Sequence, residues 1–282
     1  MATLKSFRPV IKIAKYTMTD EVRHKSFIIM FSICAVFVFL IRGCYKGNYM
    51  INGQLLDAES IAWKVSKATF HIISTGAMFI TALLSMRVFK RDREEGMQSC
   101  ILSKSIDRQQ YVLGKIIGLW ALSFLFMFIL HGLIFLIAFL NTGIIIPGYL
   151  IASLLCSLNL LFVIMFVLLL SLLLPDIMAF LCFMGISIVS FVAEGIYTLS
   201  HSQMAKAMVS RSGSYPDSGL TLGTVVYYLW PKLSGTQQWA SSLIGNEPFQ
   251  GFGSLYPIFN ILFYCLICGT FLLWCFRKED IF

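Results

Sequence analysis

Six long apolar runs, separated by short polar segments, dominate the pattern of this chain. They cover residues 26–44, 68–89, 116–140, 149–174, 177–199 and 257–276. Each is close to the roughly 20 residues that an α-helix needs to cross the hydrocarbon core of a bilayer. Strands of a membrane barrel would alternate apolar and polar residues, and runs such as LLFVIMFVLLLSLLL do not. The pattern predicts an all-α, polytopic membrane protein, a single domain with six transmembrane helices.

Composition supports this fold class. Hydrophobic residues make up 58% of the chain and charged residues 13%, whereas a soluble domain has about 25% charged residues. The first apolar run continues to spanning length, so we interpret it as a span rather than a cleavable signal. Most of the eight cysteines lie inside apolar runs, where a cysteine acts as a small apolar side chain. The C-x-x-C of Cys265 and Cys268 lies in mid-span, and we predict no metal site there.

Basic residues predict the orientation of the spans. Fifteen of the 22 lysines and arginines lie in the N-terminal segment, the connection between spans two and three, and the C-terminal tail. Because such residues accumulate on the cytoplasmic side, both termini are predicted to be cytoplasmic. We attribute the net charge of +8 to this orientation and to contact with anionic lipids. No nucleic-acid partner is expected.

Residues 1–25 have the pattern of an amphipathic helix. Apolar residues recur at spacings of three and four: Leu4, Phe7, Ile11, Ala14, Met18 and Val22. Basic residues fall beside this stripe, which is typical of a helix lying in the plane of the lipid headgroups. Because proline is tolerated at the first position of a helix, Pro9 predicts that the helix begins near Arg8. A disordered basic tail remains the alternative.

The most unusual connection covers residues 90–115, between spans two and three. Charged residues from Lys90 to Glu95 are followed by Gly96 and by an apolar patch at Met97, Ile101 and Leu102. Asp107 and Gln110 then have the spacing of a helix-start capping pair. This connection is long enough for a small helix on the membrane surface that is offered to a cytosolic partner.

Three polar residues inside the spans are candidates for function: His131, Asn159 and Glu194. Ionisable groups at such depth face protein or water rather than lipid. For His131 we favour a hydrogen bond between helices over a substrate or proton role. For Glu194 we favour neutralisation of a basic residue of the outer loop over lining a transport path.

The predicted outer loop, residues 201–256, has two halves. Its beginning, SRSGSYPDSG, is flexible by composition. Its second half carries two apolar segments separated by Pro231 and Gly235, with aromatic residues typical of a membrane boundary. We expect two short helices between about Thr221 and Gly245 that dip into the interface, and either gate a path or cap the bundle.

Catalytic motifs are absent from the sequence. There is no phosphate-binding G-x-x-x-x-G-K-[ST] loop, no H-E-x-x-H zinc motif and no G-x-S-x-G nucleophile elbow. We therefore predict no catalytic residue, no metal and no cofactor bound by this chain. The energy for any active transport would come from another chain.

The connection and its surroundings carry a family resemblance. The residues that carry it are Glu94-Glu95-Gly96, Leu102-Ser103, Arg108, Tyr111 and Gly114-Lys115, with YYLWPKL before the last span and FRKEDIF at the end. They resemble the permease subunits of type-2 ABC exporters, which include permeases for nitrous-oxide-reductase maturation, drugs and O-antigen. Ser105 replaces the usual proline and Asp107 the usual Ser or Thr, and both keep helix-start chemistry.

The resemblance implies a mechanism of mechanical coupling. Two permease copies, expected as a homodimer in a bacterial inner membrane, would each rest a coupling helix in a cleft of an ATP-binding cassette subunit. Two such subunits would bind ATP and Mg, and a periplasmic partner fits the same scheme. The expected coupling residues are Arg91, Glu94 and Glu95 at the rim of the cleft, and Gly96, Met97, Ile101, Leu102, Ser103 and Arg108.

Two other classes of function stay open. A membrane-embedded adaptor would pass ATP-driven motion to a partner without conducting a solute. A stand-alone carrier or intramembrane enzyme would need no ATPase at all. A continuous polar path between two permease copies would favour the exporter over the adaptor, and a neighbouring gene for an ATP-binding cassette would favour either over the third class.

Overall fold

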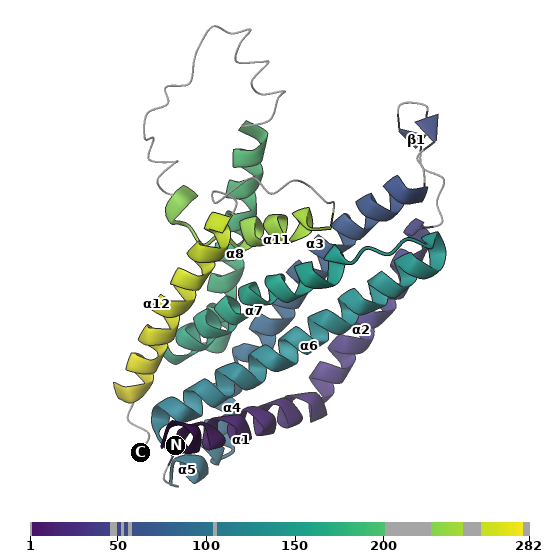
Figure 1. Cartoon of the computed structure of the whole chain (residues 1–282). Coiled ribbons are helices and arrows are strands. Elements are labelled where there is room, and N and C mark those ends of the chain that lie inside the picture. The colour runs from purple at the N-terminus through teal and green to yellow at the C-terminus, as the bar shows by residue number, and fades with distance from the viewer. Residues whose placement is uncertain are drawn as a thin grey trace, which may run out of the picture.

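The computed structural model describes residues 2–45, 50–51, 54–55, 58–103, 106–200, 227–244 and 255–278. These residues are nearly all helical (Figure 1). The helices are α1 (Ala2–Arg23), α2 (Lys25–Ile41) with the 3-10 turn η1 (Arg42–Tyr45), α3 (Ala58–Ser85), α4 (Val88–Glu94), α5 (Met97–Leu102), α6 (Arg108–Thr142), α7 (Gly148–Leu173), α8 (Asp176–Ser200), α11 (Leu233–Ser242) and α12 (Tyr256–Lys278). A two-residue antiparallel pair, β1 (Met50–Ile51) with β2 (Gln54–Leu55), follows η1.

The predicted fold class is confirmed. Six helices in the described part of the chain are long and apolar enough to cross a membrane, and each of the six predicted runs overlaps one of them. The predicted second span, residues 68–89, lies within the candidate span Ala62–Glu94, but its residues are divided between two helices, because α3 begins at Ala58 and stops at Ser85. A turn at Met86 and Arg87 separates α3 from α4, so Phe89 belongs to α4.

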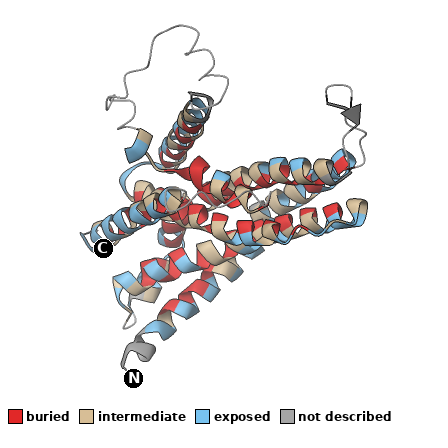
Figure 2. Cartoon of the chain, turned by 45° about the horizontal axis from the view of Figure 1, so that its top comes forward, coloured by how far each residue is buried: buried red, intermediate tan, exposed pale blue. Residues whose placement is uncertain are grey.

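Two helices form the centre of the bundle. α6 packs against α1, α3 and α7, and α7 packs against α3, α12, α11 and α8. α2, α8 and α12 lie outside this centre and expose large apolar side chains such as Ile33, Ile177 and Leu266 (Figure 2). In a membrane such side chains face lipid at no hydrophobic cost.

The two ends of the bundle differ. The start of α1 and the end of α12 lie at the end that carries α4 and α5, which we call the α4 end (Figure 1). A small apolar cluster fills this end, in which the ring of Tyr111 stacks on Phe276 and the ring of Phe89 is tilted against it. The opposite end holds α11, and we call it the α11 end. A larger apolar core extends from the middle of the bundle toward this end.

The helix predicted within residues 1–25 is α1, but it starts at Ala2 and carries Pro9 inside it, so the predicted start near Arg8 is wrong. Its packed face is Val10, Ile13 and Thr17, which are buried against α6. Most of the predicted apolar stripe points elsewhere. Phe7, Ile11 and Val22 are exposed and Ala14 is buried, whereas the side chain of Leu4 lies outside the described residues.

Gly118 lets α1 approach α6 closely. A Cβ atom at this position would lie 2.7 Å from the carbonyl oxygen of Ala14 and 2.9 Å from Cβ of Thr17. Both distances are shorter than a van der Waals contact, and the first atom belongs to the backbone, which cannot rotate away. The α1–α6 contact therefore depends on glycine at position 118.

We expect Gly118→Ala to lower the free energy of unfolding by about 1–3 kcal/mol, because the added methyl group overpacks the α1–α6 contact. Gly132→Ala is the matched control on the same helix, since a Cβ there meets nothing within 4 Å. It should be neutral or stabilise α6 by about 0.5–1 kcal/mol. Unfolding of the purified protein in detergent measures both. Equal shifts for the two variants would contradict a close contact at Gly118.

α11 is short and almost entirely buried among the spans. Leu233, Thr236 and Gln237 are fully buried, and the helix contacts α3, α7, α8 and α12. A helical turn at residues 227–229 precedes it, and the break lies at Trp230–Lys232. The prediction that the break extends to Gly235 is wrong, because Gly235 lies inside α11 and is buried. The predicted flexible segment and residues 221–226 lie outside the described residues.

Candidate functional site

Three consecutive residues of α4 form ion pairs with three different helices. The pairs are Lys90 with Asp176 at the start of α8, Arg91 with Asp20 and Glu21 of α1, and Asp92 with Lys115 of α6. Successive side chains on an α-helix point about 100° apart, so neighbours in sequence reach partners on different sides. We call this set of residues the α4 junction.

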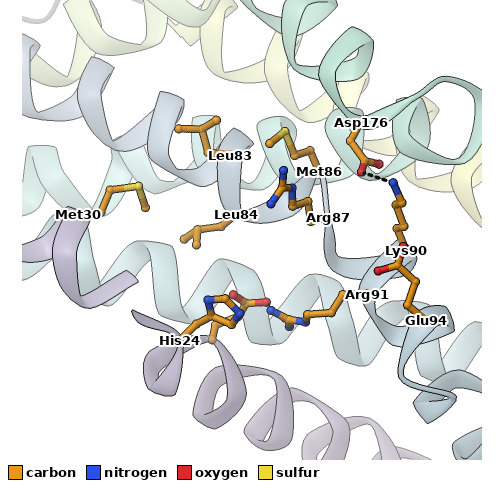
Figure 3. Close-up of a pocket in the computed structure, with 11 residues that line it drawn as sticks. His24, Met30, Leu83, Leu84, Met86, Arg87, Lys90, Arg91, Glu94 and Asp176 are labelled. Carbon is orange, nitrogen blue, oxygen red and sulfur yellow. Dashed lines mark hydrogen bonds and ion pairs between the residues drawn. The ribbon is translucent and has the colours of Figure 1, made fainter. Parts of the chain in front are cut away.

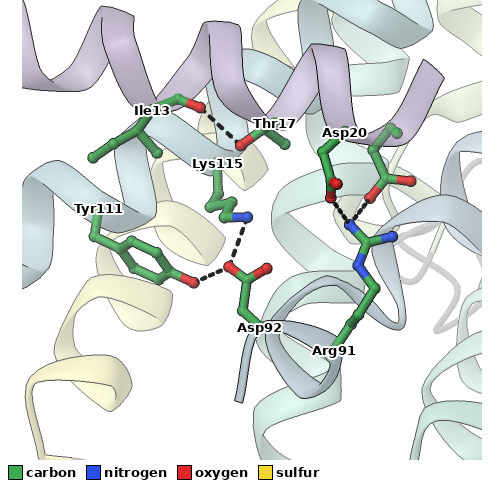
Figure 4. Close-up of polar contacts among 8 residues, drawn as sticks. Ile13, Thr17, Asp20, Arg91, Asp92, Tyr111 and Lys115 are labelled. Carbon is green, nitrogen blue, oxygen red and sulfur yellow. Dashed lines mark hydrogen bonds and ion pairs between the residues drawn. The ribbon is translucent and has the colours of Figure 1, made fainter. Parts of the chain in front are cut away.

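The pair of Asp92 and Lys115 lies in the protein interior. Lys115 Nζ is 2.6 Å from Asp92 Oδ2, and both side chains are at most 2% exposed. The hydroxyl of Tyr111 donates a hydrogen bond to the same carboxylate, as Figure 4 shows. The rings of Tyr16 and Tyr111 lie 5.7 and 5.8 Å from Nζ. Burial, helped by the nearby Asp20 carboxylate, raises the pKa of Tyr16.

Arg91 ties α4 to α1. Its Nη2 atom donates to Asp20 Oδ2 at 2.7 Å and to Glu21 Oε1 at 2.6 Å (Figure 4). Glu21 is buried, so its charge depends on this partner. The expectation that Arg91 stands at the rim of a partner's cleft is therefore corrected. The end of α1 supplies two carboxylates within reach, and they hold the guanidinium inside the chain.

The predicted surface helix is divided in two. Gly96 has a φ of 69°, in the left-handed region that favours glycine, and it separates α4 from α5. Glu94, Glu95 and Gly96 are exposed at this corner. The structure thus places these three predicted coupling residues on the surface, where they can meet another molecule.

α5 exposes Ser99 and Cys100. Met97 and Ile101 are half-buried, and Ile101 packs against the chain's own apolar cluster. The chain's own fold covers part of Ile101, so only the rest of its side chain is left for the predicted contact with a partner's cleft. Ser103 is exposed and its hydroxyl donates to the carbonyl of Cys100. The side chain of Leu102, a predicted docking residue, lies outside the described residues.

The start of α6 follows the predicted pattern. Asp107 and Gln110 form the capping box, in which the backbone N–H of Asp107 donates to Gln110 Oε1 at 3.3 Å. Arg108 Nη1 donates to the carbonyl of Arg277 at 3.0 Å, at the last turn of α12. Because carbonyl groups at a helix C-terminus carry negative partial charge, Arg108 joins α6 to α12 within the chain.

His131 is fully buried between α6 and α7. Its Nδ1 lies 2.9 Å from Ser153 Oγ, and its ring stacks on Phe70 with centroids 4.9 Å apart. This contact agrees with the predicted hydrogen bond between helices.

Asn159 and Glu194 both hold the segment that leads into α11. Asn159 Nδ2 donates to the carbonyl of Leu233 at 2.9 Å. Glu194 Oε2 lies 3.6 Å from Nζ of Lys232 and accepts a hydrogen bond from Tyr227. This agrees with the prediction that Glu194 neutralises a basic residue of the outer loop. Burial lowers the pKa of Lys232 to about 8, although Glu194 favours its charged form.

Sequence reasoning did not find the partners in the α4 junction. The sequence pattern assigned no role to Asp20, Glu21 and Asp176, and Asp92 was one charge of the row from Lys90 to Glu95. Lys115 was noted only in the family motif. Opposite charges in neighbouring segments were the available signal. Among the described residues, no group of His, Cys, Asp and Glu has the arrangement of a metal site.

The fold and the junction define a helical membrane protein in which two short helices connect the second and third spans. The chain matches the family model described as ABC-2 family transporter protein over residues 11–280. It therefore belongs to the ABC-2 transporter family and is a membrane permease of an ABC transporter. Such permeases are transport subunits that partner an ATP-binding cassette subunit. A comparison with curated proteins found no match.

Proposed function

We propose that this chain is an export permease that converts ATP hydrolysis by a separate subunit into movement of its spans. The α4 end, with both termini, would be cytoplasmic. The uneven distribution of basic residues supports this orientation. So does the position of the start of α1 and the end of α12, which lie at the same end as α4 and α5 (Figure 1).

The α4 junction is the observation that carries the proposal. A force on α5 passes through Gly96 into α4, and α4 is tied to α1, α6 and α8 at three consecutive residues. A buried pair such as Asp92 and Lys115 resists separation, because each charge would be left without a partner. Displacement of α4 therefore acts on three parts of the bundle together.

The remaining parts of the assembly follow the family resemblance. We infer a homodimer of permeases with two ATP-binding cassette subunits, and ATP with Mg bound on those subunits. The bacterial inner membrane is the expected location. The resemblance to permeases of nitrous-oxide-reductase maturation, drug and O-antigen export supports export as the direction. A periplasmic partner would meet the α11 end.

The docking surface in this proposal is the exposed corner of α4 and α5. Glu94 and Glu95 are exposed there, and neither carboxylate pairs with another residue in the described ranges. Both remain available to basic groups of a partner. They also lie beyond α3, at and after the end of α4, so we expect substitutions at these positions to leave insertion into the membrane intact.

Reversing both charges, as Glu94→Lys with Glu95→Lys, should reduce co-purification of the ATP-binding cassette subunit by about tenfold or more. Like charges facing each other across an interface cost several kcal/mol. The control is Lys12→Glu, a charge reversal at an exposed position on α1, and it should leave co-purification unchanged. Expression with the neighbouring ATPase and a pull-down on the permease measures both. Retention of the ATPase by the doubly reversed variant would refute docking at this corner.

A further inference from the structure

A pocket of about 500 Å³ opens at the side of the α4 junction (Figure 3). It lies where the end of α1 meets α2, next to the end of α3, the whole of α4 and the start of α8. Its volume is within the range of about 300–1,000 Å³ that is typical of small-molecule sites. Glu94 lines the pocket and also belongs to the exposed corner, whereas Glu95 and α5 do not line it.

Charged side chains form one half of this pocket. Lys90 and Arg91 line it, but each is already paired, with Asp176 and with Glu21. The side chain of Arg87 is exposed and forms no hydrogen bond or ion pair with another residue of the described part of the chain. Figure 3 shows its guanidinium within the ring of lining residues. Among the lysine and arginine side chains that line the pocket, Arg87 is therefore the one without a carboxylate partner in the described part of the chain.

Apolar side chains form the other half. Met30 comes from α2, and Leu83 and Leu84 come from the last turn of α3. The outer surface beyond them remains apolar, since Ile29 and Ile33 of α2 are exposed. Both helices are membrane spans, so this half of the pocket leads into the hydrocarbon region while the charged half stays at the α4 junction.

We propose that this pocket binds the phosphate headgroup of a phospholipid. The guanidinium of Arg87 would donate two hydrogen bonds to phosphate oxygens, which is the geometry that favours arginine over lysine for phosphate. The acyl chains would lie along Met30 and Leu83 and continue between α2 and α3. The carboxylate of Glu94 also borders the pocket, and it disfavours headgroups with additional negative charge.

This site adds a lipid contact to the α4 junction. The bound phosphate would lie beside the pairs of Arg91 with Glu21 and of Lys90 with Asp176, which line the same pocket. The inference needs only that the chain spans a membrane. It does not depend on docking of an ATPase, so either proposal can fail without the other.

The test is titration of the purified full chain, followed by native mass spectrometry to count bound lipids. Phosphatidylglycerol and phosphatidylcholine should each bind once per chain, whereas diacylglycerol, which has no phosphate, should bind at least tenfold more weakly. Arg87→Gln should weaken binding of both phospholipids about tenfold, the loss expected for one charge-assisted contact. Arg8→Gln removes an exposed arginine of α1 that does not line the pocket, and should change nothing.

A second variant separates lipid from free phosphate. Leu83→Ser shortens the apolar wall at a half-exposed position, so it should weaken phospholipid binding severalfold. Free glycerol phosphate should bind at least tenfold more weakly than the lipids and should be insensitive to Leu83→Ser. The proposal is overturned if diacylglycerol binds as well as the phospholipids. It is also overturned if glycerol phosphate binds as tightly as they do, or if Arg8→Gln weakens binding as much as Arg87→Gln.

Discussion

Asp92→Ala should lower the free energy of unfolding by about 3–5 kcal/mol, the cost typical of removing one partner from a buried ion pair. Lys115 is 0% exposed and its ammonium lies 2.6 Å from the lost carboxylate. Because both side chains are buried, hydration does not compensate the ammonium for the lost carboxylate. Tyr111 would also lose the acceptor of its hydroxyl hydrogen bond. Unfolding of the purified permease in detergent, followed by circular dichroism, measures the loss.

A double variant tests whether the loss comes from the unpaired charge. Asp92→Leu with Lys115→Met replaces both charges by apolar side chains of similar volume, which is often neutral or stabilising at buried pairs. It should recover most of the stability that Asp92→Ala removes. If the double variant is as unstable as Asp92→Ala, packing rather than charge pairing dominates this part of the junction.

Arg91→Ala should loosen the contact between α1 and α4 by about 2–5 kcal/mol. It leaves two carboxylates of α1 without their shared cation, and truncation of a buried, hydrogen-bonded charge pair typically costs this much. Hydrogen exchange of the α1 amides reports the free energy of local opening. Exchange near Asp20 and Glu21 should therefore accelerate strongly, while exchange in α7 stays slow.

Lys90→Ala is the matched control for this prediction. Lys90 is the preceding residue of the same helix, but its side chain is 62% exposed and lies 3.5 Å from Asp176. Exposed pairs of this kind contribute about 0–1 kcal/mol, so exchange in α1 should hardly change. Equal acceleration in the two variants would mean that α1 is not held by Arg91.

The spans were predictable because a bilayer allows few solutions. A long run without charges must be helical in lipid, so the pattern alone predicts six helices and their order. The end of α3 was not predictable in this way. Val88 and Phe89 continue the apolar pattern of the second span, and only the turn at Met86 and Arg87, which the pattern does not mark, shows that they belong to α4.

The site was predictable to a smaller extent. Glu194 and His131 could be interpreted correctly because a polar group in a span needs a partner, whichever one the fold provides. The partners of α4 were not predictable, since Arg91 and Glu21 are 70 residues apart in the sequence. The position of α1 also depends on its close approach to α6, which the absence of a Cβ atom at Gly118 permits.

The order of charges in α4 also fixes its rotation. If α4 slipped forward by one residue, Asp92 would face the carboxylates of α1 and Arg93 would face Lys115. If it slipped backward, Arg91 would face Lys115. Either change of register places a like charge against the buried ammonium, which costs several kcal/mol. α4 therefore cannot absorb a push by turning about its own axis, and a displacement of α4 must carry α1 and α6 with it or break the buried pair.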